Sequence, residues 1–272
     1  MMSNSDSVQI PDDAAFSSFR TECEIHDGWQ ICYTKGGLTV WTQDLPNNSA
    51  VQKLKTSLEC KNIAASTLYD VLHDIQYRKK WDTSVIETYD VGKLTANTDV
   101  GYYSCKCGPL KSRDFVTLRS WLPLGDDYLI INHSVKYPKL PPKKECVRAV
   151  SLLTGYLIRP TGPKSCVFFY LAQVDPRGSL PLWVVNKASQ YFAPKVMKKI
   201  LKASEKYPEW KKKHSPQHKP WLYPEQISLP SIPLSELSMQ NANELENIDE
   251  SSVSESKDYR NGDSEDDEIQ NG

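Results

Sequence analysis

The stretch 182–206, LWVVNKASQYFAPKVMKKILKASEK, decides the fold class of this chain. Its apolar residues recur at helical spacing, opposite a row of lysines: Val185, Phe192, Val196, Met197, Ile200 and Leu201. Pro194 lies inside this pattern and predicts a kink, because proline removes a backbone hydrogen bond. The stretch therefore predicts a long amphipathic helix that must pack its apolar side on another surface.

The rest of the chain predicts a sheet for that surface. A helix over 12–24, with Asp12 or Asp13 as N-cap, precedes strand-like runs at 29–34, 38–44 and 51–60. Residues 63–81 have helical spacing, and six further strand-like runs lie near 85–94, 99–107, 113–122, 127–136, 146–158 and 165–174. This order predicts an α+β helix-grip fold, in which a curved antiparallel sheet of about nine strands wraps on the long C-terminal helix.

Composition favours an intracellular protein. No stretch approaches the roughly 18 apolar residues that span a bilayer, and the start of the chain lacks the pattern of a signal peptide. Seven scattered cysteines indicate a reducing compartment, which places the protein in the cytoplasm. Cys105 and Cys107 could form half of a metal site, but no second pair stands at zinc spacing, so we expect neither a metal nor a cofactor.

Charge divides the chain near residue 220. Residues 221–272 carry 13 acidic and two basic side chains, a net charge of −11 that leaves +10 on residues 1–220. The acidic part is poor in apolar residues and rich in serine and asparagine, so it cannot bury enough surface to order itself. We therefore expect a folded domain over about 14–215 and a disordered tail over 222–272.

The sequence gives no support to catalysis. It contains no G-x-S-x-G, P-loop, H-E-x-x-H or G-x-G-x-x-G motif. We expect a protein that is not an enzyme and that has no nucleic-acid partner.

Three segments stand out: 77–82 (YRKKWD), 113–116 (RDFV) and 175–183 (DPRGSLPLW). Singly, each is read as structural; Arg78 and Asp82, for example, stand at i and i+4 and could form a plain surface pair. Together, in this order and at these separations, they resemble the landmarks of START domains. The resemblance covers about residues 14–215 and points to the phosphatidylcholine-transfer-protein branch, including its member with an acidic C-terminal tail.

This resemblance implies a tunnel for one lipid, closed by the last helix and by an omega loop at 137–144. It also implies that Arg78 binds the lipid phosphate and that Asp82 steadies Arg78. The chemistry is reasonable, because a phosphate away from water needs a permanent cation with a planar donor fork, and an unpaired buried arginine is costly.

For the rest of the head-group pocket, the resemblance points to Tyr102, Phe115, Leu152 and Thr154. Tyr102 stands where the family has a tryptophan, Phe115 and Leu152 stand where it has tyrosines, and Thr154 stands where it has a glutamine. The aromatic cage for choline is therefore less complete here. We therefore expect the protein to accept both phosphatidylcholine and phosphatidylethanolamine. The alternative is that other aromatic residues complete the cage.

The basic helix and the acidic tail suggest how membrane contact is controlled. Ten lysines and two glutamates lie between 181 and 220, and we expect Lys195, Lys198, Lys199 and Lys202 to dock reversibly on anionic membranes. Alternatively, these lysines only keep the helix soluble. Ser264 precedes four acidic residues, which predicts phosphorylation by an acidophilic kinase of the casein kinase 2 type.

The resulting hypothesis is a phospholipid transfer protein that is cytoplasmic and peripherally membrane-associated. Three alternatives remain open: a lipid-gated protein-interaction module of the same fold, an enzyme of the wider helix-grip group, and a carrier of sterol or ceramide. An ion pair argues against sterol, because an uncharged hydroxyl does not need one.

Overall fold

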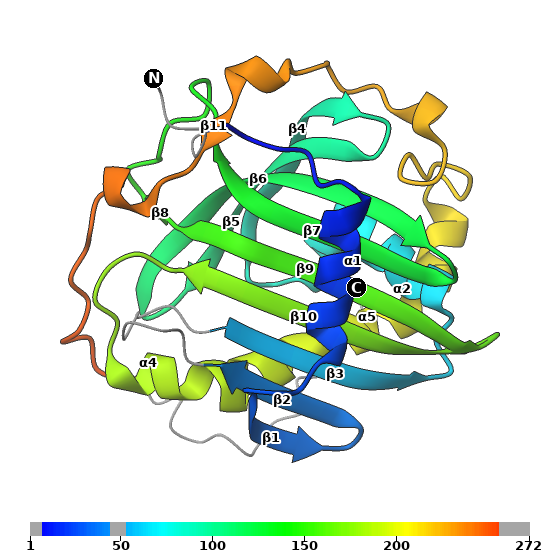
Figure 1. Cartoon of the computed structure of the whole chain (residues 1–272), viewed down its shortest axis with the longest axis horizontal. Helices are drawn as coiled ribbons and strands as arrows, with labels where there is room; N and C mark the ends of the chain where they lie inside the picture. Colours follow the sequence, from blue (N-terminus) through cyan, green and yellow to red (C-terminus); the bar gives the residue numbers. More distant parts are fainter. Residues whose placement is uncertain (1–6, 44–52, 256–272) are drawn as a thin grey trace.

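A twisted sheet organises the chain, whose computed structural model describes residues 7–43 and 53–255 (Figure 1). Its strands follow the order β1-β2-β3-β10-β9-β7-β6-β5-β4, with β8 beside β6 and β11 beside β7. Neighbours along the main path are antiparallel, and β8 runs parallel to β6. The strands are β1 Gln30–Lys35, β2 Leu38–Gln43, β3 Lys53–Lys61, β4 Val85–Thr95, β5 Thr98–Cys107, β6 Leu110–Leu124, β7 Asp127–Lys136, β8 Cys146–Arg148, β9 Val150–Gly162, β10 Ser165–Asp175 and β11 Ser238–Met239.

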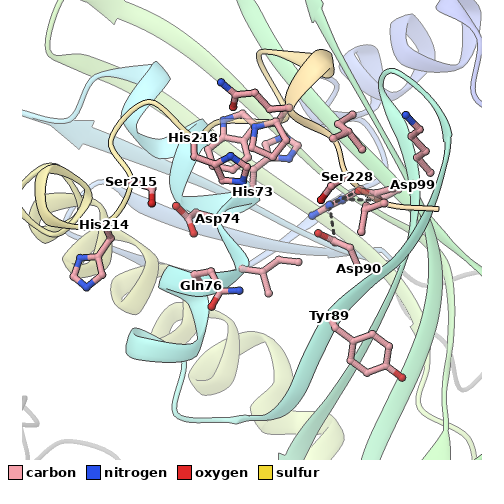
Figure 2. Close-up of a pocket in the computed structure, with 18 of the residues that line it drawn as sticks. His73, Asp74, Gln76, Tyr89, Asp90, Asp99, His214, Ser215, His218 and Ser228 are labelled. Atoms are coloured by element: carbon pink, nitrogen blue, oxygen red, sulfur yellow. Dashed lines mark hydrogen bonds and ion pairs between the residues drawn. The ribbon is translucent and has the colours of Figure 1, made fainter. Parts of the chain in front are cut away.

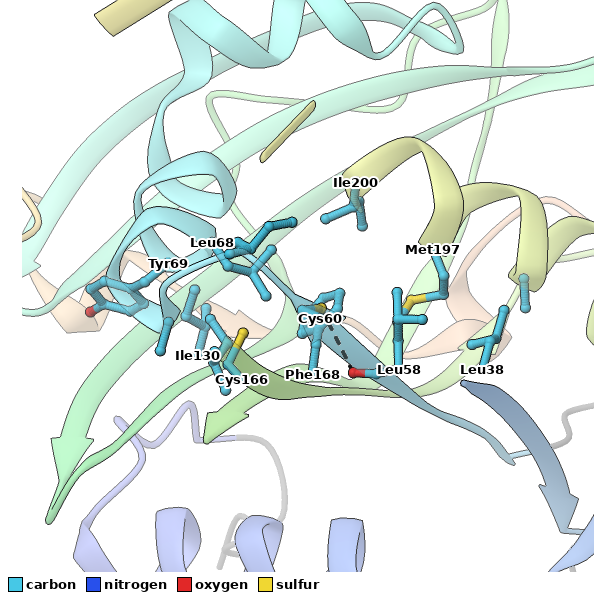
Figure 3. Packing of buried hydrophobic residues seen from close by; sticks show 14 of the residues in the cluster. Leu38, Leu58, Cys60, Leu68, Tyr69, Ile130, Cys166, Phe168, Met197 and Ile200 are labelled. Atoms are coloured by element: carbon cyan, nitrogen blue, oxygen red, sulfur yellow. Dashed lines mark hydrogen bonds between the residues drawn. The ribbon is translucent and has the colours of Figure 1, made fainter. Parts of the chain in front are cut away.

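Helices cover the inner face of this sheet. The segments are α2 Ala65–His73, α3 Ile75–Trp81, α4 Leu182–Lys187, a π-helical turn Ala188–Phe192 and α5 Ala193–Lys213. Leu68 of α2, Met197 and Ile200 of α5 and Phe168 of β10 are buried in one cluster (Figure 3). Burial of each such side chain stabilises the fold by about 1.5–3 kcal/mol. The α+β helix-grip class predicted from the sequence is confirmed.

The outer face is covered by α1, Asp13–Glu24, which crosses β7, β9 and β10 (Figure 1). Asp12 caps it by accepting a hydrogen bond from the Ala15 backbone N–H at 2.8 Å. Phe16, Phe19 and Cys23 are buried against Leu129, Ile131, Leu157 and Leu171 of the strands. The two faces of the sheet therefore have separate cores.

Next to Pro194, where a kink was predicted, the helix contains the π-helical turn Ala188–Phe192, in which the Ala193 N–H donates to the Ala188 carbonyl five residues back. Two local expectations need correction. The helical run 63–81 is broken at Asp74, which ends α2 and caps α3. The run 146–158 is two strands, β8 and β9, which are separated by Ala149.

The C-terminal strap, residues 222–255, is ordered, contrary to our expectation for the acidic tail (Figure 1). It exchanges backbone hydrogen bonds with Lys93 of β4, and it pairs with β7 through β11. Ile232 and Leu237 are buried in a cluster with β5 and β6. The prediction failed because the domain, and not the strap itself, supplies these partners. Residues 256–272, including Ser264, lie outside the described residues.

Within the part of the chain that the structure describes, no helix is both long enough and apolar enough to cross a bilayer.

Candidate functional site

The predicted Arg78–Asp82 pair is formed on the short helix α3. Arg78 Nε donates to Asp82 Oδ2 at 3.3 Å, and the Arg78 side chain keeps 33% of its surface accessible against 11% for Asp82. Asp82 ends the helix and also accepts a hydrogen bond from the Ser84 N–H at 3.3 Å. The carboxylate is thus held in place independently of the arginine.

Aromatic side chains from four strands surround Arg78. Its guanidinium carbon lies 5.6 Å from the ring centre of Tyr103 on β5, and Tyr103 stacks on Phe115 of β6 at 4.7 Å. On the neighbouring strands, Tyr156 of β9 stacks on Tyr170 of β10 at 5.3 Å. These rings form one wall of the candidate site.

The environment of this wall is poor in water. Burial raises the pKa of the hydroxyls of Tyr103, Tyr156 and Tyr170, while the positive charge of Arg78 opposes that rise. Burial alone would lower the pKa of Arg78, but Tyr156, Asp82 and Tyr103 more than offset it, so the net direction is upward. Arg78 is therefore a permanent cation in surroundings where an anion would interact with it strongly.

Tyr102 does not belong to this site. Adjacent residues of a strand point to opposite faces of the sheet, and Tyr103 takes the inner face. Tyr102 is 2% exposed on the outer face, where it stacks on Tyr89 at 5.0 Å and donates a hydrogen bond to Asp114 at 3.3 Å. The structure thus places Tyr103, and not the predicted Tyr102, opposite Phe115 and beside Arg78.

The other predicted pocket residues lie on β9. Thr154 is two residues from Tyr156, hence on the same face, and its hydroxyl shares a hydrogen bond with Ser151 at 2.8 Å. Leu152 stands at a register shift of the strand and exposes 47% of its surface. Within the described residues, neither makes a hydrogen bond or ion pair with Arg78, whereas Phe115 reaches the site through Tyr103.

The R-D-F-V segment is structural and holds the closing loops. Asp114, fully buried, accepts two hydrogen bonds from Arg148, each 3.0 Å long. Arg148 in turn donates to the carbonyls of Leu140 and Pro141, at 3.2 and 3.3 Å. The predicted omega loop, 137–144, is thereby tied to the middle of β6.

Arg113 links the second loop to the C-terminal strap. It donates to the carbonyls of Pro176 and Arg177 at 3.1 and 3.2 Å, and it pairs with Glu250 at 2.6 Å. Arg113 and Glu250 expose only 3% and 8% of their side chains. The strap is therefore anchored at the loop that leads into α4.

The predicted docking lysines lie on α5, on the side away from the sheet. Lys195, Lys198 and Lys202 are exposed and Lys199 is half-buried, while Val196 between them exposes 47% of its surface. Lys199 donates to the Thr83 hydroxyl at 3.2 Å, and Lys195 lies 5.7 Å from the ring centre of Tyr191. The helix thus presents lysines and one apolar side chain together to solvent.

A large pocket lies elsewhere, between α3, the β4–β5 hairpin and residues 210–229 (Figure 2). Its volume is about 710 Å³, and neither Arg78 nor Asp82 lines it. Its acidic residues are already paired: Asp90 and Asp99 with Arg119, and Asp74 with Lys211. Carboxylates that are already paired with a cation are poorly placed to act as acids or bases. For ligand binding, Arg78 remains the better candidate.

Metal binding gets no support from the described residues, because no three histidine, cysteine, aspartate or glutamate side chains gather there in a way that could hold an ion.

Comparison with known proteins gives a consistent result. The model of the START domain family matches residues 11–210. Mouse START domain-containing protein 10 is 63% identical over 258 residues, 94% of this chain and 89% of that protein. Mouse phosphatidylcholine transfer protein is 30% identical over 185 residues, 66% of this chain and 85% of that protein. The crystal structure of human STARD10 has a TM-score of 0.84 and 63% identity, covering 87% of this chain and 97% of that one.

Proposed function

This chain belongs to the START domain family, and we propose that it is an intracellular transfer protein that binds one phospholipid and moves it between membranes. The observation that carries the proposal is the Arg78–Asp82 pair beside a wall of aromatic side chains. The names of its relatives, which include phosphatidylcholine transfer protein, agree with it.

Arg78 is suited to the phosphate of a lipid head group. Its Nε is engaged by Asp82, and within the described residues no hydrogen bond is made by its two terminal nitrogens. A guanidinium offers those N–H groups as a planar fork that matches two phosphate oxygens. In the empty protein Asp82 keeps the arginine from being an unpaired charge away from water.

The aromatic wall is suited to the ammonium group of the head group. The faces of Tyr103, Phe115, Tyr156 and Tyr170 attract a quaternary ammonium through cation–π interaction. The tyrosine hydroxyls can also accept hydrogen bonds from a primary ammonium. We therefore propose that phosphatidylcholine and phosphatidylethanolamine both bind, although the cage residues differ from those expected from the sequence.

Enclosure of the acyl chains explains why such a carrier would be needed. Exposing a phospholipid to water costs about 0.8 kcal/mol for each methylene, so some thirty methylenes amount to roughly 20 kcal/mol. A binding site between the sheet and α5 would remove most of that cost.

Native mass spectrometry after incubation with mixed liposomes tests the proposal. We expect one phosphatidylcholine or phosphatidylethanolamine on each wild-type chain, loss of the lipid in Arg78→Ala, and retention in Lys79→Ala, which changes the exposed neighbour. Equal occupancy in wild type and Arg78→Ala would reject the phosphate site. Transfer between vesicles without added protein would separate a carrier from the alternative, a lipid-gated interaction module.

Membrane contact is proposed for the exposed face of α5. Lys195, Lys198, Lys199 and Lys202 would each contribute about 1 kcal/mol near an anionic surface. Phosphorylation of Ser264 by a casein kinase 2 type enzyme would add about −1.5 to −2 charge to an acidic segment and weaken docking. Ser264→Asp should therefore bind anionic vesicles less tightly than wild type at low salt; equal affinity would contradict this.

A further inference from the structure

Two cysteines lie side by side at the edge of the candidate site. Cys105 and Cys107 stand at i and i+2 on β5 and point to the same side, with their sulfur atoms 4.0 Å apart. Neither is bonded to another cysteine, and both are half-buried, so small reagents can reach them. We propose that Cys105 and Cys107 are a modification site: a peroxide-reactive dithiol that closes to a reversible disulfide.

The surroundings of the two thiols differ. Cys105 lies two residues after Tyr103 and close enough to Arg78 and Asp82 for their charges to act on it. Cys107 instead lies beside Arg113, the residue that anchors the C-terminal strap. The pair therefore sits between the candidate lipid site and the strap anchor.

These surroundings assign different roles to the two sulfurs. Contact with the Cys105 sulfur, 4.0 Å away, and the positive charge of Arg113 lower the pKa of Cys107, against the effect of burial. The same contact and burial raise the pKa of Cys105. Since the thiolate is the reactive form, Cys107 is the nucleophile and Cys105 the resolving thiol.

Hydrogen peroxide is the oxidant in the reaction. The Cys107 thiolate attacks one peroxide oxygen, the O–O bond breaks, and the hydroxide that leaves takes up a proton to become water. The sulfur of Cys105 then attacks the resulting sulfenic acid and displaces its hydroxide, which combines with the proton lost from Cys105. Two thiols are oxidised by two electrons, and one peroxide is reduced to two waters.

The required movement is small. A disulfide bond is about 2.0 Å long, so the sulfurs must approach by about 2 Å, a distance that side-chain rotation on one strand can supply. The register between β5 and β6 already shifts between Cys105 and Cys107, next to the hairpin turn. The backbone hydrogen bonds between β5 and β6 are already interrupted at this point. Fewer of them would therefore break when the disulfide forms than in a regular pair of strands.

A second cysteine pair in the fold serves as an internal comparison. Cys60 and Cys166 are directly opposite each other on β3 and β10, but they are 2% and 1% exposed in the core beneath α5 (Figure 3). A peroxide in water cannot reach them without opening that core. Oxidation of the folded chain should therefore select Cys105 and Cys107.

The test is a disulfide map of the full-length protein treated with hydrogen peroxide and digested with trypsin without reductant. Trypsin cuts after Lys106, between the two cysteines, so the expected bond appears as two linked peptides that separate on addition of dithiothreitol. The result is overturned if wild type keeps both thiols free, or if Cys60 and Cys166 become linked instead.

Variants identify the order of events. In Cys105→Ser, dimedone should trap a sulfenic acid on Cys107, whereas Cys107→Ser should react several-fold more slowly with peroxide. Cys146→Ser, which alters another half-buried cysteine, should behave as wild type. A Cys107→Ser chain that reacts as fast as wild type would overturn the assignment of the nucleophile, and circular dichroism confirms that each variant is folded.

Discussion

Arg148→Met is expected to lower the free energy of unfolding by about 3–5 kcal/mol, the usual cost of removing one partner of a buried ion pair. Asp114 is fully buried and Arg148 is 5% exposed, and two hydrogen bonds of 3.0 Å join them. Methionine fills most of the space of the arginine stem, so the loss comes chiefly from the stranded carboxylate. Its remaining hydrogen-bonding side chain, Tyr102 at 3.3 Å, is neutral and cannot replace the lost charge. The carbonyls of Leu140 and Pro141 also lose their donor, which loosens the omega loop.

Urea denaturation followed by tryptophan fluorescence would measure this change. The double variant Arg148→Met/Asp114→Leu should regain more than half of the lost stability, because removing both partners leaves no buried charge. The control is Lys136→Met, whose pair with Glu244 is half-exposed on both sides and should contribute less than about 0.5 kcal/mol. A loss below about 1 kcal/mol for Arg148→Met, or a double variant as unstable as the sum of the single ones, would refute the reasoning.

Three further predictions concern pH and the strap. Burial lowers the pKa of the His73 imidazole below its ordinary 6.5. As the pH falls, the unfolded chain therefore takes up a proton before the folded one does. The free energy of unfolding should fall below about pH 6.5, by up to 1.4 kcal/mol per pH unit. Denaturation midpoints between about pH 7.5 and 5.5 should change less in His73→Phe, and an unchanged slope would exclude this group. Glu250→Ala leaves Arg113 buried without its carboxylate, so protease should cut the strap at least several-fold faster than in wild type; equal cutting rates would mean that the ion pair does not hold it. Gly178→Ala places a Cβ 2.0 Å from the Ile248 carbonyl oxygen at φ +92°, which should displace the strap and speed its amide hydrogen exchange.

The sequence alone was sufficient for the order of elements and for the Arg78–Asp82 pair. Apolar residues alternate with polar ones along a strand and recur about every 3.6 residues along a helix. Both patterns are local, so nine strand-like runs and the long closing helix could be predicted from the spacing of apolar residues. The pair at i and i+4 follows in the same way, because both residues lie on one helical turn.

The faces of the strands required the tertiary structure. A shift of one residue moves a side chain to the opposite face, and nothing local distinguishes Tyr102 from Tyr103. Only the pairing of β5 with β6 sets Tyr103 on Phe115 beside Arg78 and leaves Tyr102 bonded to Asp114.

The strap also required the tertiary structure, for a different reason. Its composition cannot support a core of its own, and that much was a sound inference from the sequence. Its order comes from partners far away in the chain: Lys93 for its backbone and Arg113 for Glu250. Contacts between residues more than a hundred positions apart leave no periodic trace in the sequence, because they exist only once the sheet has brought those residues together.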